Sequence, residues 1–173
     1  MIENEMTILF ATNFSENCNE AFQASLKLAR TYKAKLILLH VLENDIPQFV
    51  EAQIKDAMGE EKWIELQNRH HDDARQILIG KMSPEKMAKS VLLEYCNDFG
   101  LNKDNCEIKK YDTIVSKGDI ATTIVEEAKK FGCQLIVLGS KKGFSQKKSI
   151  GRIVKGVMRE TKIPVLFVPH GVK

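Results

Sequence analysis

Two short segments of this chain are apolar at every position, and they constrain its fold more than any other feature. They are Leu36–Leu39 and Leu135–Leu138, and a third segment, Val165–Val168, has the same character. All three are far shorter than the ~20 residues of a membrane-spanning helix. A strand that is apolar on both faces belongs in a parallel sheet covered by helices on both sides. The chain is therefore predicted to fold as an α/β protein.

The segment between the first two strands has the periodicity of a helix. After a short strand at Thr7–Thr12, Ser15 is predicted to cap an amphipathic helix of about five turns. The apolar face of this helix comprises Cys18, Phe22, Leu26, Ala29 and Tyr32. Together with the next strand, Lys35–Val41, these elements make a β-α-β unit whose crossover is expected to be right-handed.

A long connection, residues 43–106, leads to the third strand. A helical pattern spans about residues 48–79, and Ser83-Pro84 predicts the start of a second helix that runs to about residue 99. The third strand is predicted at Ile108–Val115, where two consecutive lysines indicate an edge of the sheet. The chain thus carries an extended helical insertion between its second and third strands.

The last third of the chain continues the alternation of helices and strands. Gly118-Asp119 is predicted to cap a helix, which is followed by a strand at Gln134–Leu138. A polar loop, Gly139–Gly151, and a short helix then lead to the last strand, Ile163–Val168. Five strands alternating with helices predict a doubly wound parallel sheet in a single domain, residues 1–173.

The composition is that of a globular protein. Of the 173 residues, 43% are apolar and 28% are charged, which excludes a disordered chain. The four cysteines lack CxxC spacing, so they are predicted to be reduced thiols and not disulfides or zinc ligands. Glu3 and Glu5 stand where a signal peptide would carry basic residues. We therefore expect a cytoplasmic protein that binds neither membrane nor nucleic acid.

A ligand site is expected at the carboxyl ends of the central strands, where the strand order of a doubly wound sheet reverses. Two segments occupy such positions, Ala11–Phe14 after the first strand and Gly139–Gly143 after the fourth. Between Glu127 and Glu160 the sequence holds lysines and arginines but no acidic residue, which favours an anionic ligand. The same pattern also fits a solvated basic loop, because the segment lacks both GxxxxGK[ST] and GxGxxG.

Five segments of the chain, taken in order, resemble the universal stress protein family. They are ILFATNF (residues 8–14), LLHV (38–41), Gly118-Asp119, LIVLGS (135–140) and IPVLFVP (163–169). The resemblance implies a five-stranded parallel sheet of order 3-2-1-4-5 flanked by helices. It also implies a homodimer joined through the last strand, and binding of ATP or another adenine nucleotide such as ADP or AMP. The insertion around residues 45–105 is longer than is usual in the family.

The nucleotide-binding motif of the family is altered in this chain. The family uses an Asp that ends the first strand, the backbone at the end of the second, and G-x2-G-x9-G-[ST] after the fourth. Here Asn13 replaces the Asp, Lys142 replaces the second glycine with Gly143 one step later, and Gly151-Arg152 arrives one residue early. Asn13 would still offer a carbonyl acceptor to an adenine amine, and Arg152 would pair with phosphate. Lys142 would strain the loop by on the order of 1 kcal/mol if its position needs a positive φ.

The resemblance assigns a candidate nucleotide site to the ends of the first, second and fourth strands and to the loop that follows. Its members are Ala11, Thr12, Asn13, Val41, Leu138, Gly139, Ser140, Lys142, Gly143, Gly151, Arg152 and Ile153. No catalytic residue is assigned, because Gly139–Arg159 contains no carboxylate that would hold a metal ion. His40, inside a core strand, is expected to be a structural histidine.

Three functions remain open from the sequence. The first is a homodimeric regulatory module that binds an adenine nucleotide without efficient catalysis. The second is a homodimeric interaction module of the same family that binds no nucleotide and has no cofactor. The third is an enzyme that acts on a nucleotide or another small anionic, phosphorylated molecule, and only the basic segment supports it.

Overall fold

The computed structural model describes residues 5–15, 18–43, 61, 83–101, 108, 110–140 and 151–170. The helix expected over about residues 48–79 lies almost entirely outside these ranges, and so does most of the loop after the fourth strand. Within the described ranges, no helix combines the length and the apolar character needed to cross a bilayer.

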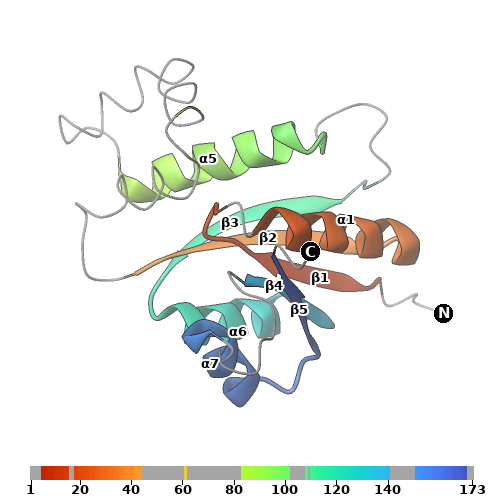
Figure 1. Ribbon diagram of the computed structural model, residues 1–173, viewed down its shortest axis with the longest axis vertical. Coiled ribbons are helices and arrows are strands. Elements are labelled where there is room, and N and C mark those ends of the chain that lie inside the picture. Colours follow the sequence, from red (N-terminus) through yellow and green to blue (C-terminus); the bar gives the residue numbers. More distant parts are fainter. Residues whose placement is uncertain are drawn as a thin grey trace.

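Five strands form one all-parallel sheet in the order β3-β2-β1-β4-β5, which confirms the predicted topology. The strands are β1 (Thr7–Ala11), β2 (Lys35–Leu42), β3 (Tyr111–Lys117), β4 (Leu135–Ser140) and β5 (Val165–Pro169). β1 is the central strand, and its Ile8 is in register with Leu36 of β2 and with Leu135 of β4. The strand order therefore reverses between β1 and β4, which lie side by side (Figure 1).

Helices cover both faces of this sheet (Figure 1). The helices on one face are α1 (Asn19–Tyr32) and α5 (Pro84–Asp98), and those on the other are α6 (Ile120–Lys130) and α7 (Arg152–Glu160). Because strand residues point alternately to the two faces, the sheet separates two apolar cores. Leu36 and Leu38 of β2 enter the core under α1 and α5, whereas Ile37 and Leu39 enter the core under α6 and α7. This double burial explains why the strand is apolar at every position.

An aromatic cluster joins α1, α5 and the sheet. The ring centroid of Phe22 lies 5.0 Å from those of Phe10 and Tyr95 and 4.8 Å from that of Phe99. Burial raises the pKa of the Tyr95 phenol far above its ordinary value. The phenol stays protonated and donates a hydrogen bond of 3.0 Å to Oδ1 of Asn19. The cluster therefore fixes α5 against α1 through both apolar and polar contacts.

Two of the predicted helix starts are confirmed. The Ser83 hydroxyl accepts a hydrogen bond from the Lys86 N–H at 3.4 Å, directly before α5. The Asp119 carboxylate accepts from the Thr122 N–H at 3.1 Å and caps α6. Both are side chains of the type that satisfies the free N–H groups of a first helical turn.

The start predicted for α1 is wrong, because this helix runs only from Asn19 to Tyr32 and Ser15 does not cap it. The Cys18 N–H donates to the Ser15 carbonyl at 2.8 Å, and the Ser15 hydroxyl donates to Oδ1 of Asn13 at 2.6 Å. A turn at Asn13 thus uses the hydroxyl that the sequence pattern assigned to the helix.

The third strand also differs from its prediction, since β3 begins at Tyr111 and ends at Lys117. Its bounds follow from pairing with β2, in which Leu36 is in register with Tyr111 and Leu42 with Lys117. β3 lies at one edge of the sheet, as the two consecutive lysines before it predicted, and β5 lies at the other.

The described cysteines are unpaired thiols, as predicted. Cys18, Cys96 and Cys133 are all buried, and Cys106 lies outside the described residues. Burial raises the pKa of Cys96 to about 12 and that of Cys133 to about 11. Both groups are therefore neutral core side chains at physiological pH.

Candidate functional site

A cavity of about 120 Å³ lies at the carboxyl ends of β1 and β4, where the strand order reverses. Doubly wound sheets hold their ligands at this position. The cavity is lined by Ala11, Thr12, Asn13, Ser15, Cys18, Leu39, Val41, Ile120, Ile124, Leu138, Gly139, Ile153 and Val154.

Apolar side chains from two helices form one wall of the cavity. Ile120 and Ile124 lie one turn apart on α6, and Ile153 and Val154 lie in the first turn of α7. Ile124 and Val154 are buried, whereas Ile153 is 37% exposed and reaches the surface. A flat apolar group can therefore enter beside Ile153 and pack against α6 and α7.

The structure brings together seven of the predicted site residues, from the ends of β1, β2 and β4 and from the first turn of α7. Ala11, Thr12, Asn13, Val41, Leu138, Gly139 and Ile153 all line the cavity. Gly151 and Arg152 begin α7 but are not part of the lining. Ser140 ends β4, and its side chain lies outside the described part of the chain, as do Lys142 and Gly143. The nucleotide-binding roles assigned to all twelve predicted residues remain predictions.

Sequence reasoning missed several lining residues, which are Ser15, Cys18, Leu39, Ile120, Ile124 and Val154. Ile120 and Ile124 could have been identified from the sequence, because both lie on the apolar face of the helix predicted after Gly118-Asp119. Ser15 and Cys18 could not have been identified from a sequence pattern, since only the turn that follows β1 brings them to the cavity.

Val41 presents its backbone to the cavity, because β2 extends past the end of β1. On the β1 side of β2, the Leu39 carbonyl accepts from the Thr12 N–H at 2.9 Å. On the β3 side, the Leu42 carbonyl accepts from the Gly118 N–H at 3.0 Å. Successive residues of a central strand bond to opposite neighbours, so the peptide groups of Val41 face the β1 side, as those of Leu39 do. Among the described residues neither group has a partner, and Val41 offers the cavity one donor and one acceptor.

The side-chain carbonyl of Asn13 is already occupied. Its Oδ1 atom accepts from the Ser15 N–H at 3.1 Å, from the Ser15 hydroxyl at 2.6 Å and from the Cys18 thiol at 3.2 Å. A backbone N–H can only donate, so the amide must turn its oxygen toward Ser15. The prediction that this carbonyl is available to an adenine amine is therefore wrong, because the turn between β1 and α1 consumes it.

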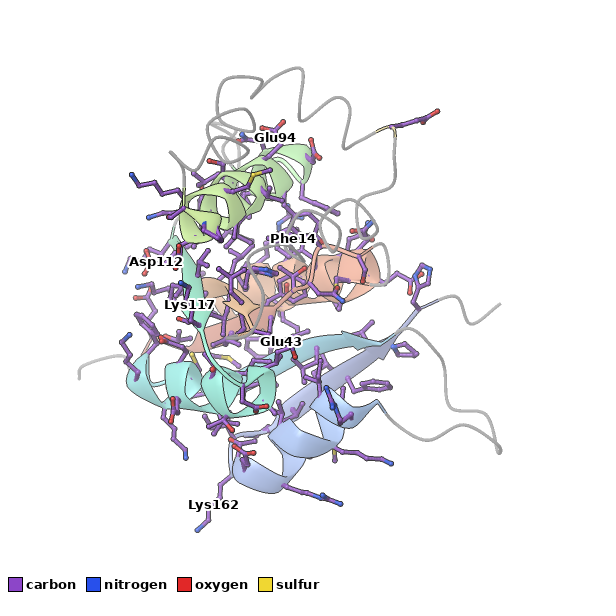
Figure 2. The ribbon with its side chains drawn as sticks, turned by 90° about the vertical axis from the view of Figure 1, so that its left-hand side faces the viewer. Phe14, Glu43, Glu94, Asp112, Lys117 and Lys162 are labelled. Carbon is purple, nitrogen blue, oxygen red and sulfur yellow. The ribbon has the colours of Figure 1, made fainter. Side chains whose placement is uncertain are left out.

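His40 and Phe14 support this turn from the core side. The His40 Nδ1–H donates to the Thr12 carbonyl at 2.8 Å, and the Phe14 N–H donates to the Thr12 hydroxyl at 2.9 Å. Phe14 adopts φ 63° and stacks on the imidazole with centroids 4.3 Å apart; Figure 2 shows it below α5. Burial lowers the pKa of His40, although the bond to Thr12 partly opposes this, so the ring is neutral at pH 7. This confirms His40 as a structural histidine.

Arg152 contributes positive charge at the first residue of α7. The pKa of Asp119 is held below its usual value, first by the Thr122 N–H bond and, more weakly, by the charge of Arg152. The guanidinium therefore lies within electrostatic range of the α6 cap. No group of three or more His, Cys, Asp or Glu side chains that would hold a metal ion occurs among the residues the structure describes.

The chain is similar in sequence to one protein family and in fold to several solved structures. The sequence model of the universal stress protein family matches residues 6–169. A search of curated protein sequences finds no significant match. Among solved structures, the hypothetical protein PH0823 aligns with a TM-score of 0.57 and 24% identity, over 97% of this chain and 98% of its own.

Two further solved structures contain nucleotides. A universal stress protein in complex with cAMP has a TM-score of 0.57 and 16% identity, over 96% of this chain and 98% of its own. The universal stress protein from Archaeoglobus fulgidus in complex with dAMP has a TM-score of 0.51 and 14% identity, over 94% of this chain and 97% of its own. At these identities the likeness is one of fold.

Proposed function

Because this chain belongs to the universal stress protein family, we propose that it is a homodimeric regulatory protein that binds a purine nucleotide without turning it over. Adenine nucleotides are the first candidates, since cAMP and dAMP are bound in two structures of the same fold. The observation that carries the proposal is the open backbone donor and acceptor of Val41 beside an apolar cavity. Such a pair reads the edge of a base while the isoleucines cover its face.

The charge around the cavity supports a ligand with phosphate groups. The backbone N–H groups at the start of α7 point away from the helix and attract anions. Arg152 stands at this helix end, and the sequence from Glu127 to Glu160 contains no acidic residue between these two. A phosphate that extends out of the cavity past Ile153 would meet this positive field.

We propose that the protein does not hydrolyse its nucleotide efficiently. Cleavage of a phosphoanhydride needs a positioned water and a metal ion held by carboxylates. Asp119, the carboxylate whose pKa responds to the charge of Arg152, is engaged as the cap of α6. We expect hydrolysis well below the ~1–10³ s⁻¹ of typical enzymes. Turnover above about 1 s⁻¹ that is lost in Arg152→Ala would instead support an enzyme.

The variant Ile153→Glu is expected to weaken AMP binding at least tenfold. The carboxylate would replace an apolar contact at the mouth of the cavity and repel the phosphate, and each effect is on the order of 1 kcal/mol. Isothermal titration calorimetry with AMP measures the change. Met158→Glu is the matched control, because Met158 is 55% exposed on the same helix and does not line the cavity. Equal AMP affinity in both variants would contradict the proposed site.

We further propose that two copies of the chain pair through β5. This strand is at an edge of the sheet, it is largely apolar, and all its residues are half-buried in the single chain. The Ile136 N–H donates to the Pro164 carbonyl at 3.0 Å, so the backbone N–H and C=O groups of the even-numbered residues of β5 point toward β4. The backbone N–H and C=O of Val165 therefore point away from the sheet, at its open edge. An apolar strand at the edge of a sheet tends to associate.

Val165→Lys is therefore expected to convert the dimer to a monomer at micromolar concentration, because a charged side chain on an edge strand opposes pairing. Light scattering coupled to size exclusion measures the mass. Gln23→Lys, which adds the same charge to the exposed surface of α1, is expected to stay dimeric. A monomeric parent protein would contradict the proposal. A dimer that binds no nucleotide would instead support the interaction module.

We make two further proposals, one on domain organisation and one on cellular location. We propose that residues 1–173 fold as one domain, since a single sheet supports both cores. We also propose a cytoplasmic location, which the reduced thiols of the described residues support.

A further inference from the structure

His40 contacts both ends of the turn that lines the cavity. Its Nδ1–H donates to the Thr12 carbonyl at 2.8 Å, and its ring stacks on that of Phe14 with centroids 4.3 Å apart. Phe14 has φ 63°, a left-handed conformation that is unfavourable for a residue with a side chain and persists only where the surroundings hold it. Asn13 lies between these two contacts and lines the cavity together with Thr12. The imidazole therefore holds, from the core side, the backbone that faces the ligand.

The neutral imidazole of His40 has one nitrogen that is free to take up a proton. The Thr12 carbonyl can only accept a hydrogen bond, so Nδ1 carries the N–H and a proton from solvent would add to Nε2. The side chain is buried, and burial lowers the pKa of His40. A charged ring at this place is unfavourable unless a neighbouring group of opposite charge compensates it.

The titratable groups in the core around the ring carry no negative charge at physiological pH. α5 contributes Tyr95 and Cys96, which are both neutral because burial raises their pKa. The Cys18 thiol, directly before α1, donates to the side-chain carbonyl of the turn. β3 contributes the apolar Val115, which is in register with His40. None of these groups compensates an imidazolium ion.

The charged side chains of the neighbouring elements are engaged or directed elsewhere. Lys117 at the end of β3 pairs with Glu85 in the first turn of α5, and the lysines of α5 are exposed. Glu43 is exposed directly after β2, where the alternation of the strand turns it to the opposite face of the sheet. Figure 2 shows Glu94 and Phe14 on opposite sides of α5. Among the described residues, burial and the Thr12 bond thus determine the protonation of His40.

We propose that His40 makes nucleotide binding sensitive to acid, because a proton on its imidazole draws the ring toward water and releases the turn that lines the cavity. A ring that moves toward water gives up its stacking on Phe14 and its bond to Thr12. Phe14 then loses the contacts that hold its left-handed conformation. His40 is thus a positioning residue. The inference rests on the proposed nucleotide site and names a regulation of that site.

Proton uptake by His40 and nucleotide binding then oppose each other. The nucleotide binds the form in which His40 is neutral, so it should lower the pKa of His40 further, and a falling pH should weaken binding through the same linkage. Because the pKa in the folded protein lies below the ordinary value of 6.5, the neutral ring stabilises the fold fully above pH 6.5 and loses this effect as the pH falls. Affinity should follow the same direction, with a limit of about tenfold per pH unit.

AMP binding by the parent protein and by His40→Asn, at pH 7.5 and at pH 5.0, provides the test. The asparagine amide can still donate to the Thr12 carbonyl but takes up no proton in this range. Titration of the AMP phosphate cancels in the ratio of the two association constants, parent over variant. Calorimetry on the full chain is expected to show this ratio falling at least threefold between the two pH values. A role in structure alone would lower the affinity of the variant equally at both.

His170→Asn is the matched control. It removes a histidine that follows β5, lies outside the cavity lining and has a side chain 36% exposed. This variant should lose AMP affinity on acidification by the same factor as the parent protein.

A measurement on the unaltered protein tests the inference even if His40→Asn does not fold. Nitrogen NMR of the imidazoles should show His40 with its hydrogen on Nδ1 at pH 7.5. Saturation with AMP should move the midpoint of its titration to lower pH, as the linkage requires.

The outcomes separate this inference from the proposed function. If the parent protein and His40→Asn lose AMP affinity by the same factor, or if AMP leaves the titration of His40 unchanged, the acid sensitivity assigned to His40 is overturned. The nucleotide site itself still stands in that case, provided that Ile153→Glu weakens AMP binding at pH 7.5. If AMP does not bind at millimolar concentration at pH 7.5, the proposed site and its regulation by His40 both fail.

Discussion

Replacing Phe22 by alanine is expected to lower the free energy of unfolding by about 3–5 kcal/mol, as is typical of a large buried aromatic. Phe22 is fully buried, and its ring contacts those of Phe10, Tyr95 and Phe99. Deletion of the ring leaves a cavity that these neighbours, held by the sheet and by α5, fill only in part. Since domains are stable by only about 5–15 kcal/mol, the variant would be close to unfolding.

Urea denaturation followed by circular dichroism measures this change. Tyr32→Ala is the matched control, because Tyr32 is another aromatic residue of α1 but is 59% exposed. Its effect should stay within about 0.5 kcal/mol. A Phe22→Ala protein as stable as this control would contradict the structural role of the cluster.

A substitution at Gly156 is expected to have the second largest effect. A Cβ on this residue of α7 would lie 2.7 Å from the Cβ of Ala121 on α6, closer than carbon atoms approach one another. Gly156→Val must therefore push the two helices apart, and overpacking of this kind destabilises proteins by about 1–3 kcal/mol. The same shift displaces Ile153 and Val154, so affinity for nucleotide should fall together with stability.

Exchanging the two residues provides the control for this experiment. In the double variant Ala121→Gly/Gly156→Ala, one methyl group remains between α6 and α7, and the helix propensities of the two changes cancel. Its stability should lie within about 1 kcal/mol of the parent. A Gly156→Val variant with unchanged melting temperature and unchanged nucleotide affinity would show that α6 and α7 are not in close contact.

The alternation of apolar strands and amphipathic helices was sufficient to predict the class of fold, and the family resemblance supplied the strand order. These features follow from burial, which leaves a direct mark on the sequence at positions such as Leu36–Leu39. The bounds of β3 were less predictable, because they depend on the register with β2 and not on the composition of β3 itself.

The candidate site could be predicted in position but not in its hydrogen bonding. The ends of β1 and β4 follow from topology, so Ala11, Asn13 and Gly139 were found in advance. The hydrogen bonding of the Asn13 side chain depends on a turn in which Ser15 and Cys18 donate to its Oδ1 atom. Such a turn leaves no periodic pattern in the sequence from which it could be predicted. The same limit applied to Ser15, whose residue type fits a helix cap and a turn equally well.

The central place of β1 also determines when, during synthesis, the cavity comes into existence. β1 and β2 can pair once Leu42 has left the ribosome, but the wall formed by α7 is complete only after Val154. At about 5–20 residues per second, the intervening stretch of roughly 110 residues takes roughly 6–22 s to translate. Until β4 has been synthesised, which takes up most of that interval, the nascent chain exposes the edge of β1 that β4 later covers. A ligand of the cavity can therefore stabilise finished chains through mass action, while nascent chains gain nothing from it.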